Sequence, residues 1–262
     1  MTSPNHMQNI ALPSKPKYTE IKKNHGKFEI GGCYPGYGST LGNALRRVLL
    51  SSLPGAAIRS VKIKGVSHEF STIPGVMEDV VQVILNLKQV RFRSHSDEAV
   101  TVTLKAKGEG VVTGKDIKCS SSVEVVNPDQ VIATLSDKKA ELEMDIVVDR
   151  GLGYVAVETR EDEEREIGEI AVDAIYTPVK RVNYEVENMR VGKRTDYDKI
   201  TLEVVTDGSI APEEAFKQSV QILVGQFSVL LEEEVTEMET KEETPVEEVK
   251  PKKVKGEEKE EE

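Results

Sequence analysis

The sequence predicts an α+β fold, in which amphipathic helices near both ends of the chain flank a strand-rich region. The apolar residues recur with a helical period in 40–52 and 212–231, whereas 90–157 holds several short alternating runs. Two longer alternating segments occupy 180–208. At 262 residues the chain can bury the core of one large domain or two small ones. Helices packed on antiparallel strands account for all three patterns.

The N-terminal part predicts a hairpin followed by a helix. Residues 18–30 read as two short strands joined by a turn at Asn24-His25-Gly26. Thr40 is a suitable N-cap, no Gly or Pro interrupts 43–53, and Pro54-Gly55 closes the segment. We therefore expect a helix of about three turns over 40–52.

The two faces of this helix differ in character. A core-facing stripe is predicted for Leu41, Ala44, Leu45, Val48, Leu49 and Ser52. The other side carries Asn43, Arg46, Arg47 and Leu50. Because paired Arg and Leu side chains suit a protein contact better than open solvent, this face is a candidate docking surface. An ordinary solvated face is the alternative.

The glycines before the helix raise a second alternative, a phosphate-binding turn. Gly36, Gly38 and Gly42 are spaced G-x-G-x-x-x-G, one residue longer than the dinucleotide-binding pattern. No Lys-Ser or Lys-Thr pair follows them, as a phosphate loop would require. An autonomous phosphate-binding enzyme is thus kept only as a competing hypothesis.

The middle of the chain is predicted to be mainly β. A strand is expected at 56–66 and a helix from Val76 to Lys88, with Glu78 and Asp79 at its positive end. Short strands then continue to Val157, and the charged run 160–165 reads as a surface loop. The last two alternating segments predict an antiparallel pair with one buried face, formed by Val182, Tyr184, Val186, Ile200, Leu202 and Val204.

The last predicted helix begins near Pro212 and has an apolar seam. Its apolar residues recur at spacings of four and three, which is typical of a helix that packs along another helix. These residues are Phe216, Val220, Leu223, Phe227 and Leu230. From 233 to 262 the chain is mostly Glu and Lys without aromatic residues, so we expect a disordered acidic tail.

Charge and composition limit the classes of function that the chain can have. Of the formal net charge of −11, residues 231–262 contribute −8 through 14 Glu and 6 Lys, so strong DNA binding by this chain alone is not expected. The two Cys residues and the lack of an apolar leader favour a reduced, cytoplasmic setting without a membrane. The four His residues share no ligand spacing, and Asp145 and Asp149 lack further acidic partners. We expect no catalytic residue, cofactor or metal.

Long blocks of the sequence resemble the bacterial RNA polymerase alpha subunit in its N-terminal region. The resemblance runs from about residue 15 to 232 and includes "GYGSTLGNALRRVLLSSLPG", "GVSHEFSTIPGVMEDVVQVILNLK" and "KRVNYEVENMRVGKRTDYDKITLEVV". It implies a discontinuous dimerisation domain at 1–54 and 177–232, with an inserted β-rich domain at 55–176. The chain return between the two parts of the first domain follows from the resemblance alone.

The resemblance also implies a function and its contact residues. It describes a homodimeric, non-catalytic scaffold within DNA-directed RNA polymerase, a nucleotidyltransferase, that docks the beta and beta-prime subunits and meets DNA only through the assembled enzyme. Contacts to beta map to Arg47 and Leu50, and contacts to beta-prime map to Lys88, Val172 and Val179. The dimer interface is expected at Leu41, Leu45, Phe216, Val220, Leu223, Phe227 and Leu230.

The resemblance ends before the acidic tail. Family members commonly carry a further helical domain that contacts promoter DNA and activators, and this chain is expected to lack it. A dimeric binding module unrelated to transcription is the third hypothesis.

Overall fold

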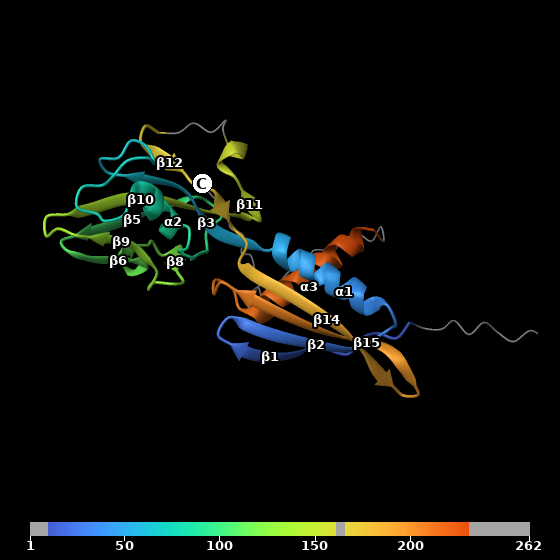
Figure 1. Cartoon of the computed structure of the whole chain (residues 1–262). Helices are drawn as coiled ribbons and strands as arrows, with labels where there is room; N and C mark the ends of the chain where they lie inside the picture. Colours follow the sequence, from blue (N-terminus) through green and yellow to red (C-terminus); the bar gives the residue numbers. More distant parts are fainter. Residues whose placement is uncertain (1–9, 161–165, 231–262) are drawn as a thin grey trace, which may run out of the picture.

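The computed structural model describes residues 10–160 and 166–230 and confirms the α+β fold class. Figure 1 shows two lobes joined by two passages of the chain. The helix lobe contains residues 10–53 and 178–230, whereas the strand lobe contains 54–177. The predicted tail and most of the charged loop at 160–165 lie outside the described residues.

The helix lobe is a four-stranded antiparallel sheet covered on one face by two helices (Figure 1). Its strands are β1 (Lys17–Lys22), β2 (His25–Cys33), β14 (Val179–Val191) and β15 (Arg194–Thr206). They lie in the order β1-β2-β15-β14, and the helices are α1 (Tyr37–Ser51) and α3 (Pro212–Val229). The predicted pairing of the last two long strands is confirmed.

The strand lobe is built around a mixed-length antiparallel sheet. Its path follows β7-β5-β10-β3-β4-β8, and β12 adds to β3. The strands are β3 (Pro54–Ile63), β4 (Phe92–Ser94), β5 (Val100–Lys107), β7 (Ile117–Lys118), β8 (Val123–Val125), β10 (Glu141–Leu152) and β12 (Glu169–Ala171). Two small sheets pair β6 (Gly110–Thr113) with β9 (Val131–Leu135) and β11 (Tyr154–Val155) with β13 (Ala174–Ile175). The helix α2 (Val80–Leu87) and the short 3₁₀ turns η1 (Gly114–Asp116) and η2 (Val157–Arg160) complete it.

Each lobe buries its own apolar core. In the helix lobe, alternate residues of β2, β14 and β15 meet the inner faces of α1 and α3, as their two periodicities require. In the strand lobe, β5 and β10 contribute every second residue, and β3 contributes Ile58, Val61 and Ile63 across a register shift. The helix α2 packs Val80, Val83 and Leu87 into the same core. A smaller cluster of Ala57, Ala174 and Tyr176 lies between the two cores.

The two connections between the lobes lie side by side at this smaller cluster. Gly55 and Tyr176 approach so closely that a Cβ atom at position 55 would lie 1.8 Å from the Tyr176 carbonyl oxygen. The Tyr176 hydroxyl donates a 2.7 Å hydrogen bond to Asp149. Burial raises the pKa of Tyr176 above its ordinary value, and the Asp149 carboxylate adds to the effect.

The glycine-rich turn before α1 is bound by a carboxylate of the chain itself. The backbone N–H groups of Gly36 and Gly38 each donate a 2.9 Å hydrogen bond to one oxygen of Asp198, a buried residue of β15. Free N–H groups at a helix N-terminus attract anions, and here Asp198 satisfies that preference. These donors are therefore occupied by the chain itself, which argues against the phosphate-binding alternative.

Gly38 and Gly42 allow α1 to lie directly on the sheet. A Cβ atom at Gly38 would come within 2.7 Å of Val186, and one at Gly42 within 2.6 Å of the Tyr184 ring. Both distances are shorter than side chains tolerate, so the glycines set how closely the helix approaches β14.

We expect Gly42→Ala to destabilise the protein by about 1–3 kcal/mol, because the added methyl group must displace the Tyr184 ring. Chemical denaturation measures the loss. Gly225→Ala in α3 is the matched control, since a Cβ atom there meets nothing within 4 Å and Ala favours a helix. Equal stability of the two variants would contradict the proposed close packing.

Several predicted boundaries were wrong by a few residues. Thr40 lies inside α1, and Gly36 is the N-cap because Asp198 supplies the capping interaction. The first turn falls before His25, which begins β2, and the closing Pro54 begins β3. The second helix starts at Val80, because Asp79 caps it through the Gln82 N–H at 2.7 Å.

Candidate protein-interaction site

The outer face of α1 presents two unpaired cations. Arg46 and Arg47 are exposed, and within 10–160 and 166–230 neither guanidinium group forms an ion pair or a hydrogen bond. Leu50, predicted on the same face, is partly buried and packs against the core of the helix lobe. The outer face of α1 therefore carries two exposed positive charges beside one partly buried apolar side chain.

The second surface is the C-terminal half of α3, which extends beyond the sheet. Its apolar side chains remain exposed, with Val224, Phe227, Val229 and Leu230 between 58% and 76% accessible. Large apolar groups gathered on one helix end are uncommon on the surface of a monomer. This segment needs a partner if its apolar area is to leave water.

Residues predicted for the dimer interface divide into two groups. Leu45 and Phe216 are buried within the chain, where Phe216 stacks on Phe28 with ring centroids 4.3 Å apart. Leu41, Val220 and Leu223 are partly buried against the same core. Phe227 and Leu230 are exposed, so the apolar seam is continuous from the core to the surface.

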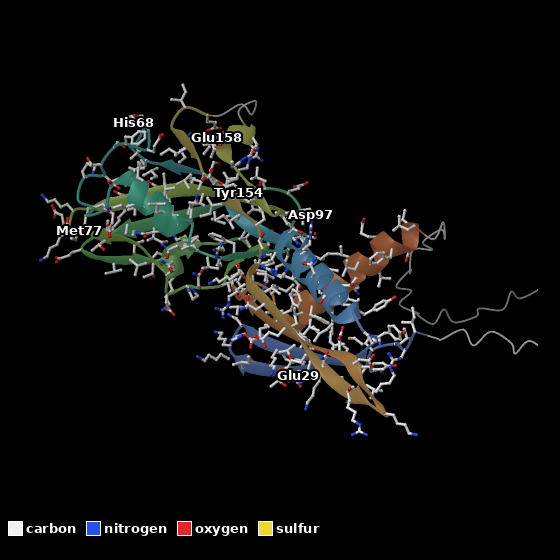
Figure 2. All side chains as sticks on the ribbon, turned by 45° about the vertical axis from the view of Figure 1, so that its right-hand side comes forward. Glu29, His68, Met77, Asp97, Tyr154 and Glu158 are labelled. Carbon is white, nitrogen blue, oxygen red and sulfur yellow. The ribbon has the colours of Figure 1, made fainter. Side chains whose placement is uncertain are left out.

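The third surface is a cleft in the strand lobe, about 400 Å³ in volume, between α2 and β12. Lys88, Val172 and Asp173 line it, together with His68, which Figure 2 shows on this lobe, far from Glu29 of the helix lobe. The Lys88 ammonium lies 3.1 Å from the Asp173 carboxylate. The Val157 N–H, and then Lys88, hold the pKa of Asp173 below its ordinary value.

Of the three predicted beta-prime residues, the structure brings two together. Lys88 and Val172 line the same cleft, although the Val172 side chain is buried in the core. Val179 begins β14 and is buried in the core of the helix lobe. Asp173, which holds Lys88, has no periodic signal in the sequence and was not predicted.

Other kinds of site are scarce in the described part of the chain. There, no group of three or more His, Cys, Asp or Glu residues is placed to hold a metal ion. Nor does any helix within those residues combine the length and apolar character needed to cross a membrane. Asp149, one of the two strand carboxylates considered above, is used by the Tyr176 hydroxyl.

The fold and these surfaces define an α+β protein of two lobes that leaves two helix faces and one cleft exposed. The family description "RNA polymerase Rpb3/RpoA insert domain" matches residues 61–177. A protein of Moorella thermoacetica named DNA-directed RNA polymerase subunit alpha is 50% identical over 238 residues, 88% of this chain and 76% of that protein.

Proteins of the same name from Carboxydothermus hydrogenoformans and Symbiobacterium thermophilum are similarly close. The first is 51% identical over 229 residues, covering 86% of this chain and 73% of the relative. The second is 49% identical over 235 residues, covering 87% and 74%. The chain belongs to the family of DNA-directed RNA polymerase alpha subunits.

Proposed function

We propose that this chain acts in the cytoplasm as the alpha subunit of a DNA-directed RNA polymerase, and that it forms a homodimer that docks the beta and beta-prime subunits. The names of its relatives support the subunit role, and RNA polymerase is a multi-subunit enzyme. The single observation that carries the scaffold role is that the outer face of α1 exposes two adjacent arginines, Arg46 and Arg47, without an ion-pair partner in the described chain. Catalysis then belongs to the assembled enzyme.

The proposal gives each surface a different partner. The exposed end of α3 meets a second copy of the chain, because its apolar seam continues from the core of the helix lobe. The α1 face with Arg47 and Leu50 docks beta, and the cleft with Lys88 and Val172 docks beta-prime. Val179 and Val172 are both buried, but of the two only Val172 lines the cleft with Lys88, so we infer that Val179 supports the start of β14 rather than touching beta-prime.

The two lobes correspond in this proposal to the predicted dimerisation domain and its insert. The separate apolar cores support that division, as does the match of the insert-domain description to residues 61–177. A dimeric module unrelated to transcription would share the α3 seam. It would have no use for the cationic face of α1.

We expect Arg47→Ala to weaken the affinity for beta about thirtyfold, since an interfacial Arg contributes about 2 kcal/mol or more to binding. Co-purification of beta with the variant measures this loss. The dimer and its thermal unfolding should be unchanged, because Arg47 is exposed and unpaired within the described chain. Arg181→Ala is the matched control, being an exposed Arg of β14. Wild-type binding of beta by the Arg47 variant would refute the assignment.

The wild-type chain also tests the function as a whole. It should co-purify with beta and beta-prime when the three are expressed together. A stable dimer that retains neither large subunit would favour the unrelated binding module.

A further inference from the structure

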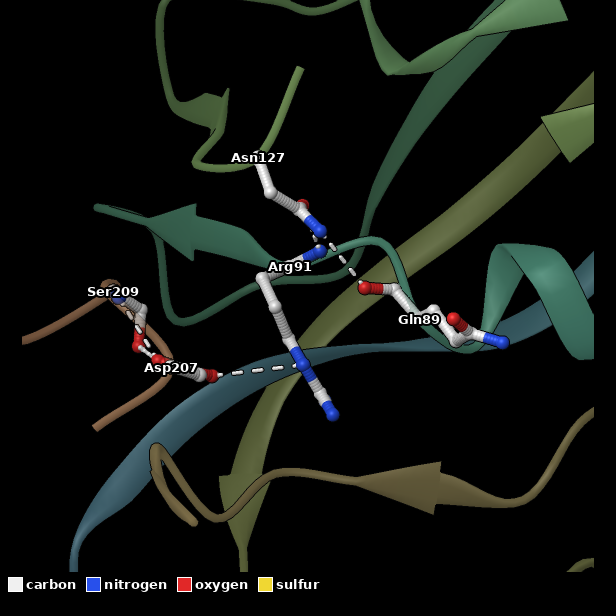
Figure 3. A network of polar contacts seen from close by, with 5 residues as sticks. All are labelled: Gln89, Arg91, Asn127, Asp207 and Ser209. Carbon is white, nitrogen blue, oxygen red and sulfur yellow. Dashed lines mark hydrogen bonds and ion pairs between the residues drawn. The ribbon is translucent and has the colours of Figure 1, made fainter. Parts of the chain in front are cut away.

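A network of polar contacts links the lobes beside the two chain connections described above (Figure 3). One side is formed in the strand lobe by Arg91, directly before β4, and Arg93, within β4. The other side is the turn Asp207–Ser209, directly after β15 in the helix lobe. We call these residues the interlobe clamp.

Arg91 makes the buried part of the clamp. Its Nε atom lies 3.8 Å from an Asp207 carboxylate oxygen, and the two side chains are only 21% and 7% exposed. The other Asp207 oxygen accepts hydrogen bonds from the backbone N–H and the hydroxyl of Ser209. The turn therefore holds its carboxylate toward Arg91, and little water screens the pair.

The Arg93 side chain binds the same turn at two backbone carbonyl oxygens of the turn. Its Nε donates a 2.8 Å hydrogen bond to the Ser209 carbonyl oxygen, and one terminal nitrogen donates to the Gly208 carbonyl oxygen at 3.2 Å. A planar guanidinium group that binds two successive carbonyls fixes direction as well as distance. Lys at this position could not reproduce the arrangement.

Both sides of the clamp are braced within their own lobes. Asn127 accepts a 2.7 Å hydrogen bond from the Arg91 N–H and donates one of 3.0 Å to the Gln89 carbonyl oxygen. On the other side, the Asp207 N–H donates to the Pro178 carbonyl oxygen at 2.9 Å. Because each end is rigidly held, the contacts between them restrict how the lobes can turn.

The turn is also wedged between the lobes. A Cβ atom at Gly208 would lie 2.8 Å from Asn24 of the helix lobe and 3.1 Å from Val126 of the strand lobe. Thus the backbone there touches both lobes at once. Only a residue without a side chain fits such a gap.

We propose that Arg91 and Arg93 are positioning residues that fix the orientation of the strand lobe relative to the helix lobe. They thereby set the spacing between the Arg47 face and the Lys88 cleft, a consequence that rests on the proposed function. Two docking surfaces on separate lobes can serve one rigid assembly only if their relative placement is held.

The test is a distance measurement between spin labels, one on each lobe, in the full chain. Labels are attached through Lys138→Cys and Glu187→Cys, both at exposed positions, after Cys119→Ser removes the exposed native thiol. Mixing with excess unlabelled chain keeps the measured distances within one molecule. The native clamp should give a single narrow distribution.

The double variant Arg91→Ala/Arg93→Ala should at least double the width of that distribution. Arg150→Ala is the matched control, since Arg150 pairs with Asp97 inside the strand lobe at 2.8 Å, and its removal should leave the width unchanged. A lower unfolding temperature with an unchanged width would overturn the proposal, because a purely stabilising contact behaves in that way. If the double variant does not fold, Arg93→Ala alone carries the same expectation and the same refutation.

Co-purification separates this proposal from the function on which its consequence rests. The double variant should retain beta but lose most of the complex that contains both large subunits. If the wild-type chain retains neither subunit, the proposed function fails while the label distances still decide the clamp.

Discussion

Replacing both Leu223 and Phe227 by Glu should convert the proposed dimer into a monomer. Phe227 is 60% exposed within the chain, and Leu223 borders it on the same seam of α3. Burying a large apolar side chain contributes about 1.5–3 kcal/mol, and because Leu223 is already partly buried within the chain, the loss of Phe227 alone should weaken dimerisation at least about tenfold. The new carboxylates add the cost of removing charge from water.

Sedimentation or light scattering across a range of concentrations measures this effect. Gln221→Glu provides the control, since Gln221 is exposed and lies about 160° around the helix from Leu223 at 100° per residue. The control should remain a dimer. A folded dimer in the double variant at low micromolar concentration would show that α3 does not form the seam.

Asp198→Ala should lower the free energy of unfolding by about 3–4 kcal/mol. The variant leaves the N–H groups of Gly36 and Gly38 without their acceptor, and Gly38 is buried. Hydrogen bonds to a charged group contribute about 1.5–3 kcal/mol each, and a stranded buried donor cannot recover all of this from water. The start of α1 should become the least protected part of the helix.

Chemical denaturation at one fixed protein concentration measures the loss, because the proposed dimerisation would make stability depend on concentration. Asp198→Asn keeps an acceptor oxygen without the charge, so its effect should be smaller. Asp196→Ala is the surface control, since Asp196 pairs with Arg194 in a half-exposed contact. A loss below about 1 kcal/mol in Asp198→Ala would exclude the capping role.

The sequence predicted those features that depend on periodicity. The shared buried face of β14 and β15 follows from alternation, and the α1 stripe follows from helical spacing. Phe216 illustrates the limit of this reasoning, because it is buried, as its spacing indicates, but its partner is Phe28 in β2 of the same chain. A spacing pattern shows that a side chain is buried without showing what covers it.

Contacts between distant segments could not be predicted in the same way. Asp198 lies 162 positions from Gly36, and no sequence pattern around either residue indicates that the two are in contact. The clamp residues Arg91 and Asp207 are ordinary charged residues in the sequence. The resemblance to a family supplied the chain return, whereas the residue contacts across it required coordinates. The contacts to beta, beta-prime and a second copy stay predictions.

The helix lobe, built from two distant parts of the chain, has a consequence for synthesis on the ribosome. The first part emerges long before its partner, and Asp198 follows Gly36 by 162 residues. At about 5–20 residues per second the delay is roughly 10 to 30 seconds. During that interval β2 lacks its neighbour β15, and the apolar face of α1 has no sheet to cover it.

The strand lobe can fold within this delay, since all its strands lie in one continuous stretch. Its entry and exit, Gly55 and Tyr176, then stand side by side and shorten the search by which β2 finds β15. Closing a long flexible loop costs conformational entropy. A strand lobe that is already folded has lost this entropy before β2 meets β15. We expect the strand lobe to act as an internal template during translation, and the helix lobe to be the last part of the nascent chain to become resistant to proteases.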